Sequence, residues 1–214
     1  MGKMAAERMR SAFLKVAGYL VPLVQSMPTF WTGLMTLPFA GYLVVIFANL
    51  PVNLPRALSD LLLSMPFLIP EKVLVIAGLL ILVFSAVYLR IKKKAGLVTS
   101  GPYGLVRHPQ YLGMILSTLG LTSLSVWILS NTFGIGFLSR SQTIALWFAE
   151  LFAYILLAYV EERHLSRAYG ESFESYKSHV PFLIPFLKTS RRDLDVFASV
   201  LVPAVLLFGL VGFH

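Results

Sequence analysis

The sequence predicts an all-α, polytopic membrane protein with about five transmembrane helices and an N-terminal interfacial helix. Of its 214 residues, 57% are hydrophobic and 13% are charged, whereas a soluble domain carries about 25% charged residues. The mean hydropathy is +0.77, and long uncharged stretches recur along the chain. Cysteine is absent, which excludes disulfides, cysteine-based zinc sites and thiol nucleophiles.

Each predicted span is an apolar stretch near the length that a membrane helix requires. The hydrocarbon layer is about 30 Å thick and needs about 20 residues of helix to cross it. Residues 11–28 are interrupted by Lys15 and Pro22, so we expect them to lie in the interface instead. The predicted spans are 30–50, 73–89 with an extension back through 66–70, 109–129, 141–160 and 196–213.

The positive charges predict the orientation of these spans. Residues 1–15, 90–108 and 161–193 hold 4, 5 and 6 Lys+Arg, which is 15 of the 18. Five spans would put these stretches on one side, and Lys and Arg concentrate in cytoplasmic loops. We therefore expect a cytoplasmic N-terminus and an outside C-terminus. The net charge of +8 then reflects topology and anionic lipid, so no nucleic acid is expected as a partner.

No repeat or low-complexity linker divides the chain, so we expect a single membrane domain over residues 1–214. Helices occupy 1–94, the polar stretches lie within 95–186, and 187–214 add a further C-terminal transmembrane helix. The domain should be multi-pass, with its functional residues on the cytoplasmic side.

The first polar stretch runs from Gly96 to Gly113 and leads directly into a predicted span. Pro109 suits a first helical turn, so Arg107 and His108 lie at a helix N-terminus, which favours an anion. The alternative is a positive-inside anchor, with Tyr103 and Tyr111 in the interfacial aromatic belt.

The second polar stretch begins with Glu161 and Glu162 at the end of another span. Adjacent carboxylates are costly near a membrane unless they are paired. One interpretation is helix-end solvation with shielding by Arg163 and Arg167, and the other is that one carboxylate binds a cation.

Together these stretches resemble the isoprenylcysteine carboxyl methyltransferases, which are related to membrane phospholipid methyltransferases. The first motif is similar to the family's cofactor loop, from Leu97-Val98-Thr99-Ser100-Gly101 through Arg107-His108-Pro109 to Gly113. The second is similar over Glu161-Glu162, Leu165, Tyr169-Gly170, Tyr176 and Val180-Pro181. The resemblance implies an enzyme that transfers a methyl group from S-adenosylmethionine to an amphiphilic substrate, such as a prenylcysteine carboxylate.

The resemblance also implies roles for individual residues. Glu161 would pair with the ammonium group of the cofactor, a charge-assisted contact. Arg107 and Glu162 are the implied catalytic residues, with Arg107 holding the loop or neutralising an anion and Glu162 bracing Arg107 or a backbone N–H group. The implied cofactor site comprises Leu97, Val98, Tyr103, His108, Pro109, Tyr111 and Glu161.

Two residues of the predicted span 141–160 are assigned to the substrate. Leu157 stands where the prenylcysteine enzymes have an arginine that orients the substrate carboxylate, so we expect an acceptor that is neutral, an amine or paired elsewhere. Glu150 lies eleven residues before Glu161 and nearly on the same helix face, which favours contact with a polar substrate group. The alternative for Glu150 is a structural acid that bonds to Ser117, Thr118 or Thr122.

Other activities remain open at this point. One is a phospholipid or other lipid amine N-methyltransferase, and another is an NADPH-dependent membrane reductase of the sterol type. In each case a lipid-like or lipidated substrate would enter from the bilayer. No metal is expected, because the spacing of His164 and His179 from carboxylates matches no zinc or iron site.

Overall fold

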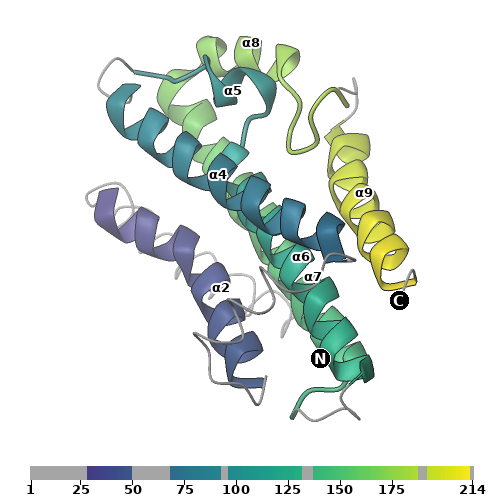
Figure 1. Cartoon of the computed structure of the whole chain (residues 1–214). Coiled ribbons are helices and arrows are strands. Elements are labelled where there is room, and N and C mark those ends of the chain that lie inside the picture. Colours follow the sequence, from purple (N-terminus) through teal and green to yellow (C-terminus); the bar gives the residue numbers. More distant parts are fainter. Residues whose placement is uncertain (1–27, 50–67, 93–95, 132–136, 188–191, 213–214) are drawn as a thin grey trace, which may run out of the picture. The chain divides into compact units, whose positions relative to one another are not determined.

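The computed structural model describes residues 28–49, 68–92, 96–131, 137–187 and 192–212, and all regular structure in these ranges is helical. This confirms the predicted all-α class. The helices are α2 (Pro28–Asn49), α4 (Ile69–Lys92), α5 (Pro102–Leu105), α6 (Pro109–Asn131), α7 (Arg140–Tyr169), α8 (Glu171–His179) and α9 (Arg192–Gly212) (Figure 1).

Within the described residues, the helices that are long and apolar enough to cross a membrane are α4, α6, α7 and the part of α9 from Leu194 to Gly212. The protein is therefore an integral, polytopic membrane protein. The predicted span 30–50 corresponds to α2, whose apolar part Gly33–Ala48 is shorter than the others. Residues 11–27, most of the predicted interfacial helix, lie outside the described part of the chain.

Helix α7 extends further than the apolar pattern predicts. It begins at a capping box, in which Ser139 and Gln142 exchange hydrogen bonds between side chain and backbone. It ends at Tyr169, nine residues beyond the predicted limit at Val160, and Gly170 caps it. The charged residues after Val160 end the apolar stretch but do not break a helix, so α7 carries Glu161 and Glu162 on continuous helical backbone.

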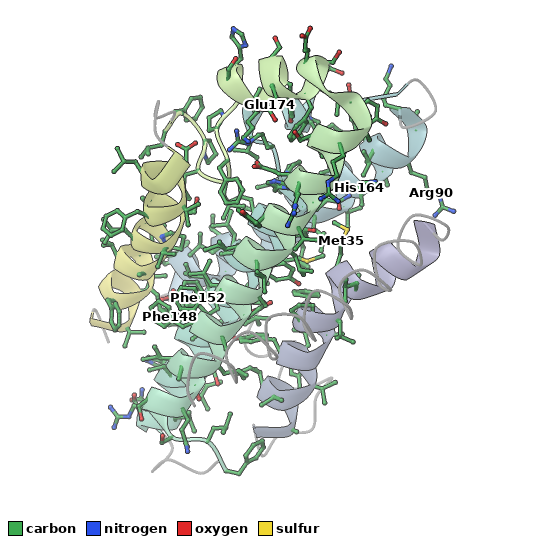
Figure 2. All side chains as sticks on the ribbon, turned by 180° about the vertical axis from the view of Figure 1, so that it is seen from behind. Met35, Arg90, Phe148, Phe152, His164 and Glu174 are labelled. Carbon is green, nitrogen blue, oxygen red and sulfur yellow. The ribbon has the colours of Figure 1, made fainter. Side chains whose placement is uncertain are left out.

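Helix α6 packs against α4, α7 and α9 (Figure 1). A Cβ added at Gly113 would lie 2.7 Å from the backbone oxygen of Gly78 and 2.7 Å from the backbone nitrogen of Leu82. Glycine therefore permits a backbone approach between α4 and α6 that any larger residue would prevent. On α9, Phe208 contacts Phe148 of α7 with ring centroids 6.2 Å apart, and Figure 2 labels Phe148 on α7.

The chain divides into two compact units, residues 1–38 and 39–214. The first contains the start of α2, and the second contains the rest of α2 and every other described helix. All of the site described below lies in the second unit. The expected single domain over 1–214 stays a prediction.

Candidate functional site

The loop before α6 is held in place by the segment around α8. Gly101 has a φ of 62°, a left-handed conformation that glycine adopts without strain, and it starts the short helix α5. The Tyr176 hydroxyl donates to the backbone oxygen of Tyr103 at 2.7 Å, and the Arg107 amide donates to the oxygen of Pro181 at 2.9 Å. The loop and the end of the second motif therefore form one local structure.

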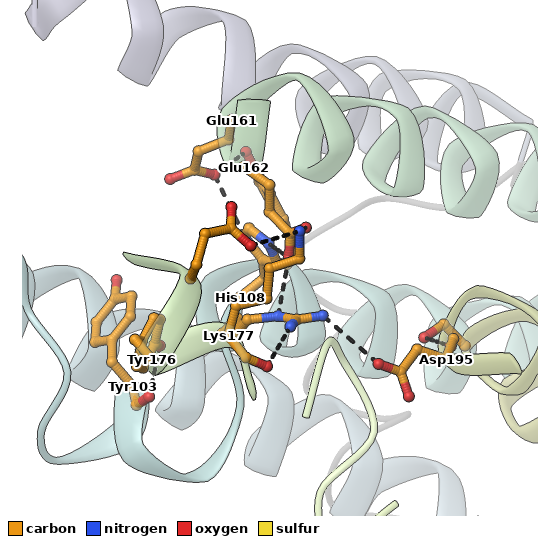
Figure 3. A network of polar contacts seen from close by, with 11 residues as sticks. Tyr103, His108, Glu161, Glu162, Tyr176, Lys177 and Asp195 are labelled. Atoms are coloured by element: carbon orange, nitrogen blue, oxygen red, sulfur yellow. Dashed lines mark hydrogen bonds and ion pairs between the residues drawn. The ribbon is translucent and has the colours of Figure 1, made fainter. Parts of the chain in front are cut away.

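Arg107 makes ion pairs within a group of charged residues. Figure 3 labels the other members of this group, which are His108, Glu161, Glu162, Lys177 and Asp195. Its Nε is 2.8 Å from Glu162 Oε1, and one terminal nitrogen donates to the backbone oxygen of Lys177 at 2.9 Å. The other terminal nitrogen is 3.7 Å from Asp195 of α9. The Arg107 and Glu162 side chains are 4% and 2% exposed, so this ion pair is shielded from water. Below, the charged network means Arg107, His108, Glu161, Glu162, Lys177 and Asp195.

His108 is placed between two carboxylates. Its Nδ1 is 3.4 Å from Glu161 Oε2, and its Nε2 is 3.4 Å from Glu162 Oε1. Burial alone would lower the pKa of His108, but the hydrogen bonds and negative charges of Glu161 and Glu162 outweigh burial and raise this pKa above its ordinary value. His108 therefore holds a proton more firmly than a free histidine does.

Aromatic rings surround His108. The ring of Tyr111 stacks on it with centroids 5.4 Å apart, and Phe182 meets it edge-on at 5.2 Å. The guanidinium of Arg107 lies 5.4 Å from the Phe182 centroid, within the range of a cation–π contact. These rings exclude water from one side of the network, which strengthens its ion pairs.

Glu161 is the site carboxylate that reaches the surface beside His108. Its side chain is 24% exposed, and it accepts a hydrogen bond of 3.0 Å from the Tyr111 hydroxyl. Glu162, the next residue, faces inward. Glu161 can therefore accept a hydrogen bond from a bound molecule while Glu162 stays with Arg107 and His108.

Sequence reasoning missed three residues of this site. Lys177 of α8 lies 3.9 Å from Glu162 and 3.8 Å from Glu174, and its signal was its place beside Tyr176 in the second motif. Asp195 was detectable as an acid at the start of an apolar stretch. Phe182 carried no signal beyond its position after Pro181.

The remaining predicted residues lie in several places. Leu97 packs against the buried cluster of Phe173, Tyr176 and Val180. Val98 is half-buried in the same loop, and Pro109 is the buried first residue of α6. Leu157 is half-buried on α7, outside the charged network as defined above.

Glu150 belongs to a second polar group. It is buried on α7, and the Thr118 hydroxyl of α6 lies beside it. The Tyr42 hydroxyl of α2 makes a 2.6 Å hydrogen bond with the Thr122 hydroxyl and donates to the Thr118 backbone oxygen at 3.1 Å. We call Tyr42, Thr118, Thr122 and Glu150 the hydroxyl cluster. In the described part of the chain, no group of three or more His, Asp or Glu could hold a metal ion.

Comparison with known proteins gives a family match and two relatives. A model of the ergosterol biosynthesis ERG4/ERG24 family matches residues 13–187, more than four fifths of the chain. The chain is 32% identical over 110 residues to the cobalt-zinc-cadmium resistance protein CzcN of Cupriavidus metallidurans, covering 51% of this chain and 45% of that protein. It is 30% identical over 112 residues to the nickel-cobalt-cadmium resistance protein NccN of Alcaligenes xylosoxydans xylosoxydans, covering 51% and 46%.

The chain thus spans about half the length of the curated relatives it matches. No solved structure matches it.

The family match overturns the functional prediction made from the sequence. It identifies a sterol reductase family that uses NADPH. The predictions of an isoprenylcysteine carboxyl methyltransferase, of its lipid amine alternative and of S-adenosylmethionine are therefore wrong. The physical reason is that the motifs describe charged residues in a loop, Arg107 and His108, and just beyond the apolar part of a helix, Glu161 and Glu162. Such an arrangement of charges does not by itself specify which cofactor is bound.

Proposed function

The chain belongs to the ergosterol biosynthesis ERG4/ERG24 family, and on this premise we propose that it is an NADPH-dependent membrane reductase that saturates a carbon–carbon double bond in a sterol-like lipid. The observation that carries the proposal is the family match over residues 13–187. That range contains every residue of the charged network except Asp195.

The charged side chains at the site are of the kinds that bind a nicotinamide dinucleotide. A carboxylate that accepts hydrogen bonds from ribose hydroxyls and an arginine that donates hydrogen bonds to a phosphate are recurrent features of such sites. Glu161 is a partly exposed carboxylate, and Arg163 and Arg167 are exposed arginines further along α7. We infer that Glu161 bonds to the ribose or carboxamide and that these arginines hold phosphates. The other cofactor contacts would come from Leu97, Val98, Tyr103, Pro109 and Tyr111.

When bound, NADPH supplies a hydride, so the chain must supply the proton that completes saturation. His108 suits this role, because the two carboxylates raise its pKa and Tyr111 stacks on its ring. Proton donation by a positioned side chain contributes about 10²–10⁴-fold to a reaction rate. We assign His108 as the residue that holds the proton.

Arg107 and Glu162 would position His108 rather than touch substrate. Both side chains are almost fully buried and 2.8 Å apart, and Glu162 also lies 3.4 Å from the imidazole. Replacing either residue would move the imidazole and change its pKa. The sequence predicted Arg107 and Glu162 as catalytic residues, and we propose instead that they position the catalytic His108.

The substrate would enter from the bilayer, and the N-terminus and active site would lie in the cytoplasm, where NADPH is present. The charge bias of the loops supports this orientation. Because the chain has no cysteine, Ser130→Cys and Ser178→Cys give clean tests with an impermeant thiol reagent in intact cells. Cysteine 130 should be labelled directly, and cysteine 178 only after permeabilisation. The reverse pattern would contradict this orientation.

Hydride transfer can be measured directly. Purified protein in nanodiscs would be given NADPH deuterated at C4 and a mixture of sterols with ring and side-chain double bonds. We expect deuterium in a saturated sterol by mass spectrometry, and thermal stabilisation by NADPH but not by S-adenosylhomocysteine. His108→Gln and Glu161→Gln should abolish transfer or weaken NADPH binding, whereas Glu174→Gln at an exposed position should not. Absence of an NADPH-dependent shift in the wild type would refute the proposal.

A further inference from the structure

The hydroxyl cluster contains a carboxyl group without an obvious structural task. Glu150 is 5% exposed, and neither of its carboxyl oxygens makes a hydrogen bond of good geometry, the Thr118 hydroxyl being a polar neighbour that interacts with it. It lies within α7, a helix long and apolar enough to cross the membrane. Buried polar groups in proteins are almost always hydrogen-bonded, so each exception requires an explanation. An ionisable residue within a membrane span is more often functional than structural.

The hydroxyl groups of α6 do not donate hydrogen bonds to Glu150, because their protons are used elsewhere. Thr118 donates to the backbone oxygen of Met114 at 3.0 Å, and Thr122 donates to that of Thr118 at 2.7 Å. Ser117 donates in the same way to Gly113 at 2.8 Å. A hydroxyl has one proton to give. The structural alternative then reduces to a contact between the Glu150 carboxyl group and the Thr118 hydroxyl, which leaves at least one carboxyl oxygen without a partner.

We propose that Glu150, with Tyr42 and Thr122 of the same cluster, binds the hydroxyl group of the lipid substrate inside the membrane. A lipid alcohol supplies a hydrogen-bond donor, which the surrounding hydroxyl groups do not offer to Glu150. It can donate to a Glu150 oxygen, and it can accept a hydrogen bond in return. Thr122 and Tyr42 keep oxygen lone pairs that can accept as well.

The environment of the cluster indicates a lipid as the occupant. The helices that carry the cluster expose apolar side chains around it, including Val44 of α2 at 69% and Phe152 of α7 at 53%. In a membrane these side chains face acyl chains, since no water is present at that depth. A neutral alcohol can reach this depth at a smaller cost than a charged amine or phosphate.

The cluster is connected to the charged network along α7. Tyr154 lies one turn beyond Glu150, and its ring contacts that of Tyr111 with centroids 5.2 Å apart. Tyr111 in turn donates to Glu161. Glu150 and Glu161 are eleven residues apart, which is about 16 Å along the helix axis. An elongated lipid alcohol bound at Glu150 can therefore extend its double bond towards His108.

This inference rests on the proposed reductase function and names how the substrate is recognised. The test uses tritiated cholesterol and cholesteryl methyl ether as probes, in scintillation proximity binding to protein in nanodiscs. The ether has the same skeleton but cannot donate a hydrogen bond. We expect the wild type to bind cholesterol at least tenfold more tightly than the ether. Glu150→Leu should remove this difference, and Glu150→Gln, which can still donate and accept, should retain part of it.

Phe152→Leu, a change on the lipid-facing side of the same helix, is the matched control and should keep the wild-type preference. Equal binding of the two probes by the wild type would overturn the inference, as would an unchanged preference in Glu150→Leu. NADPH-induced thermal stabilisation is measured on the same samples and should be unaffected by Glu150→Leu. If NADPH does not stabilise even the wild type, the reductase function is refuted. The preference for cholesterol over the ether tests the role of Glu150 separately.

Discussion

The charged network and the hydroxyl cluster are both buried, yet they satisfy their polar groups in opposite ways. In the network, Arg107 lies within 4 Å of two carboxylates, and His108 contacts Glu161 and Glu162. In the cluster, one carboxyl group lies among hydroxyls whose protons go to helix backbone. The network is held together by pairs of opposite charge, and the cluster by neutral hydrogen bonds.

Because of this difference, the two regions should respond differently to changes in charge and in pH. Removing one member of a buried ion pair leaves an uncompensated charge and is strongly destabilising. Removing a neutral hydrogen bond costs about 0.5–1.5 kcal/mol. The network should therefore respond strongly to charge and pH, whereas the cluster should respond weakly to both and select for a neutral ligand.

The largest effect is expected for Arg107→Met. The change leaves Glu162 and Asp195 without the guanidinium between them, so the free energy of unfolding should fall by about 3–5 kcal/mol. Thermal unfolding in detergent measures it, with Arg163→Met at an exposed position as the control. A loss no larger than that of Arg163→Met would show that the network does not depend on its central charge.

The second effect is a dependence of stability on pH that His108 carries. Its folded-state pKa is raised above an unfolded value of about 6.5. The stabilisation is therefore complete below about pH 6.5 and is lost as pH rises through the raised pKa. Each unit of separation contributes about 1.4 kcal/mol. The Tm should fall from pH 6 to pH 9, and His108→Gln should flatten the profile.

The matched control for His108 is His179→Gln. His179 is exposed at the end of α8, so the profile of this variant should follow that of the wild type. If the Tm of His108→Gln falls between pH 6 and pH 9 as steeply as that of the wild type, a group other than His108 causes the pH dependence.

A smaller effect is expected for Asp195→Asn. The Asp195 carboxylate is 3.7 Å from Arg107 and 10% exposed, and Glu162 remains at 2.8 Å. The loss should be about 1 kcal/mol, well below that of Glu162→Gln. A cost equal to that of Glu162→Gln would make α9, which lies outside the family match, an essential part of the site.

The smallest effect is expected for Tyr42→Phe in the hydroxyl cluster. It removes the hydroxyl that bonds to both Thr122 and the Thr118 backbone oxygen. Because that hydroxyl has a single proton to donate, the cost should be about 1 kcal/mol or less and equal at pH 6 and pH 9. Tyr88→Phe, which removes an exposed hydrogen bond to Ser100, should cost less. A strong pH dependence of the Tyr42→Phe effect would remove the distinction between the two regions.

Much of the fold follows from local properties of the sequence. The apolar stretches 73–89, 109–129, 141–160 and 196–213 each lie within a helix of the structure apart from the last residue of the fourth, which is not described. A run of about 20 apolar residues must satisfy its own backbone as a helix in hydrocarbon. The extension of α7 and the existence of α8 were missed, because both are polar segments without that constraint.

The sequence by itself determined that Arg107 and His108 would lie at the start of one helix, and that Glu161 and Glu162 would follow the apolar part of another. It did not determine how they pair or what they bind. Only the tertiary structure placed Asp195 and Lys177 around the same charges and gave Glu150 a separate environment. The physical reason is that ion pairing depends on distances of a few ångströms between segments far apart in the chain. Such distances arise when helices pack against one another, and no local pattern encodes them.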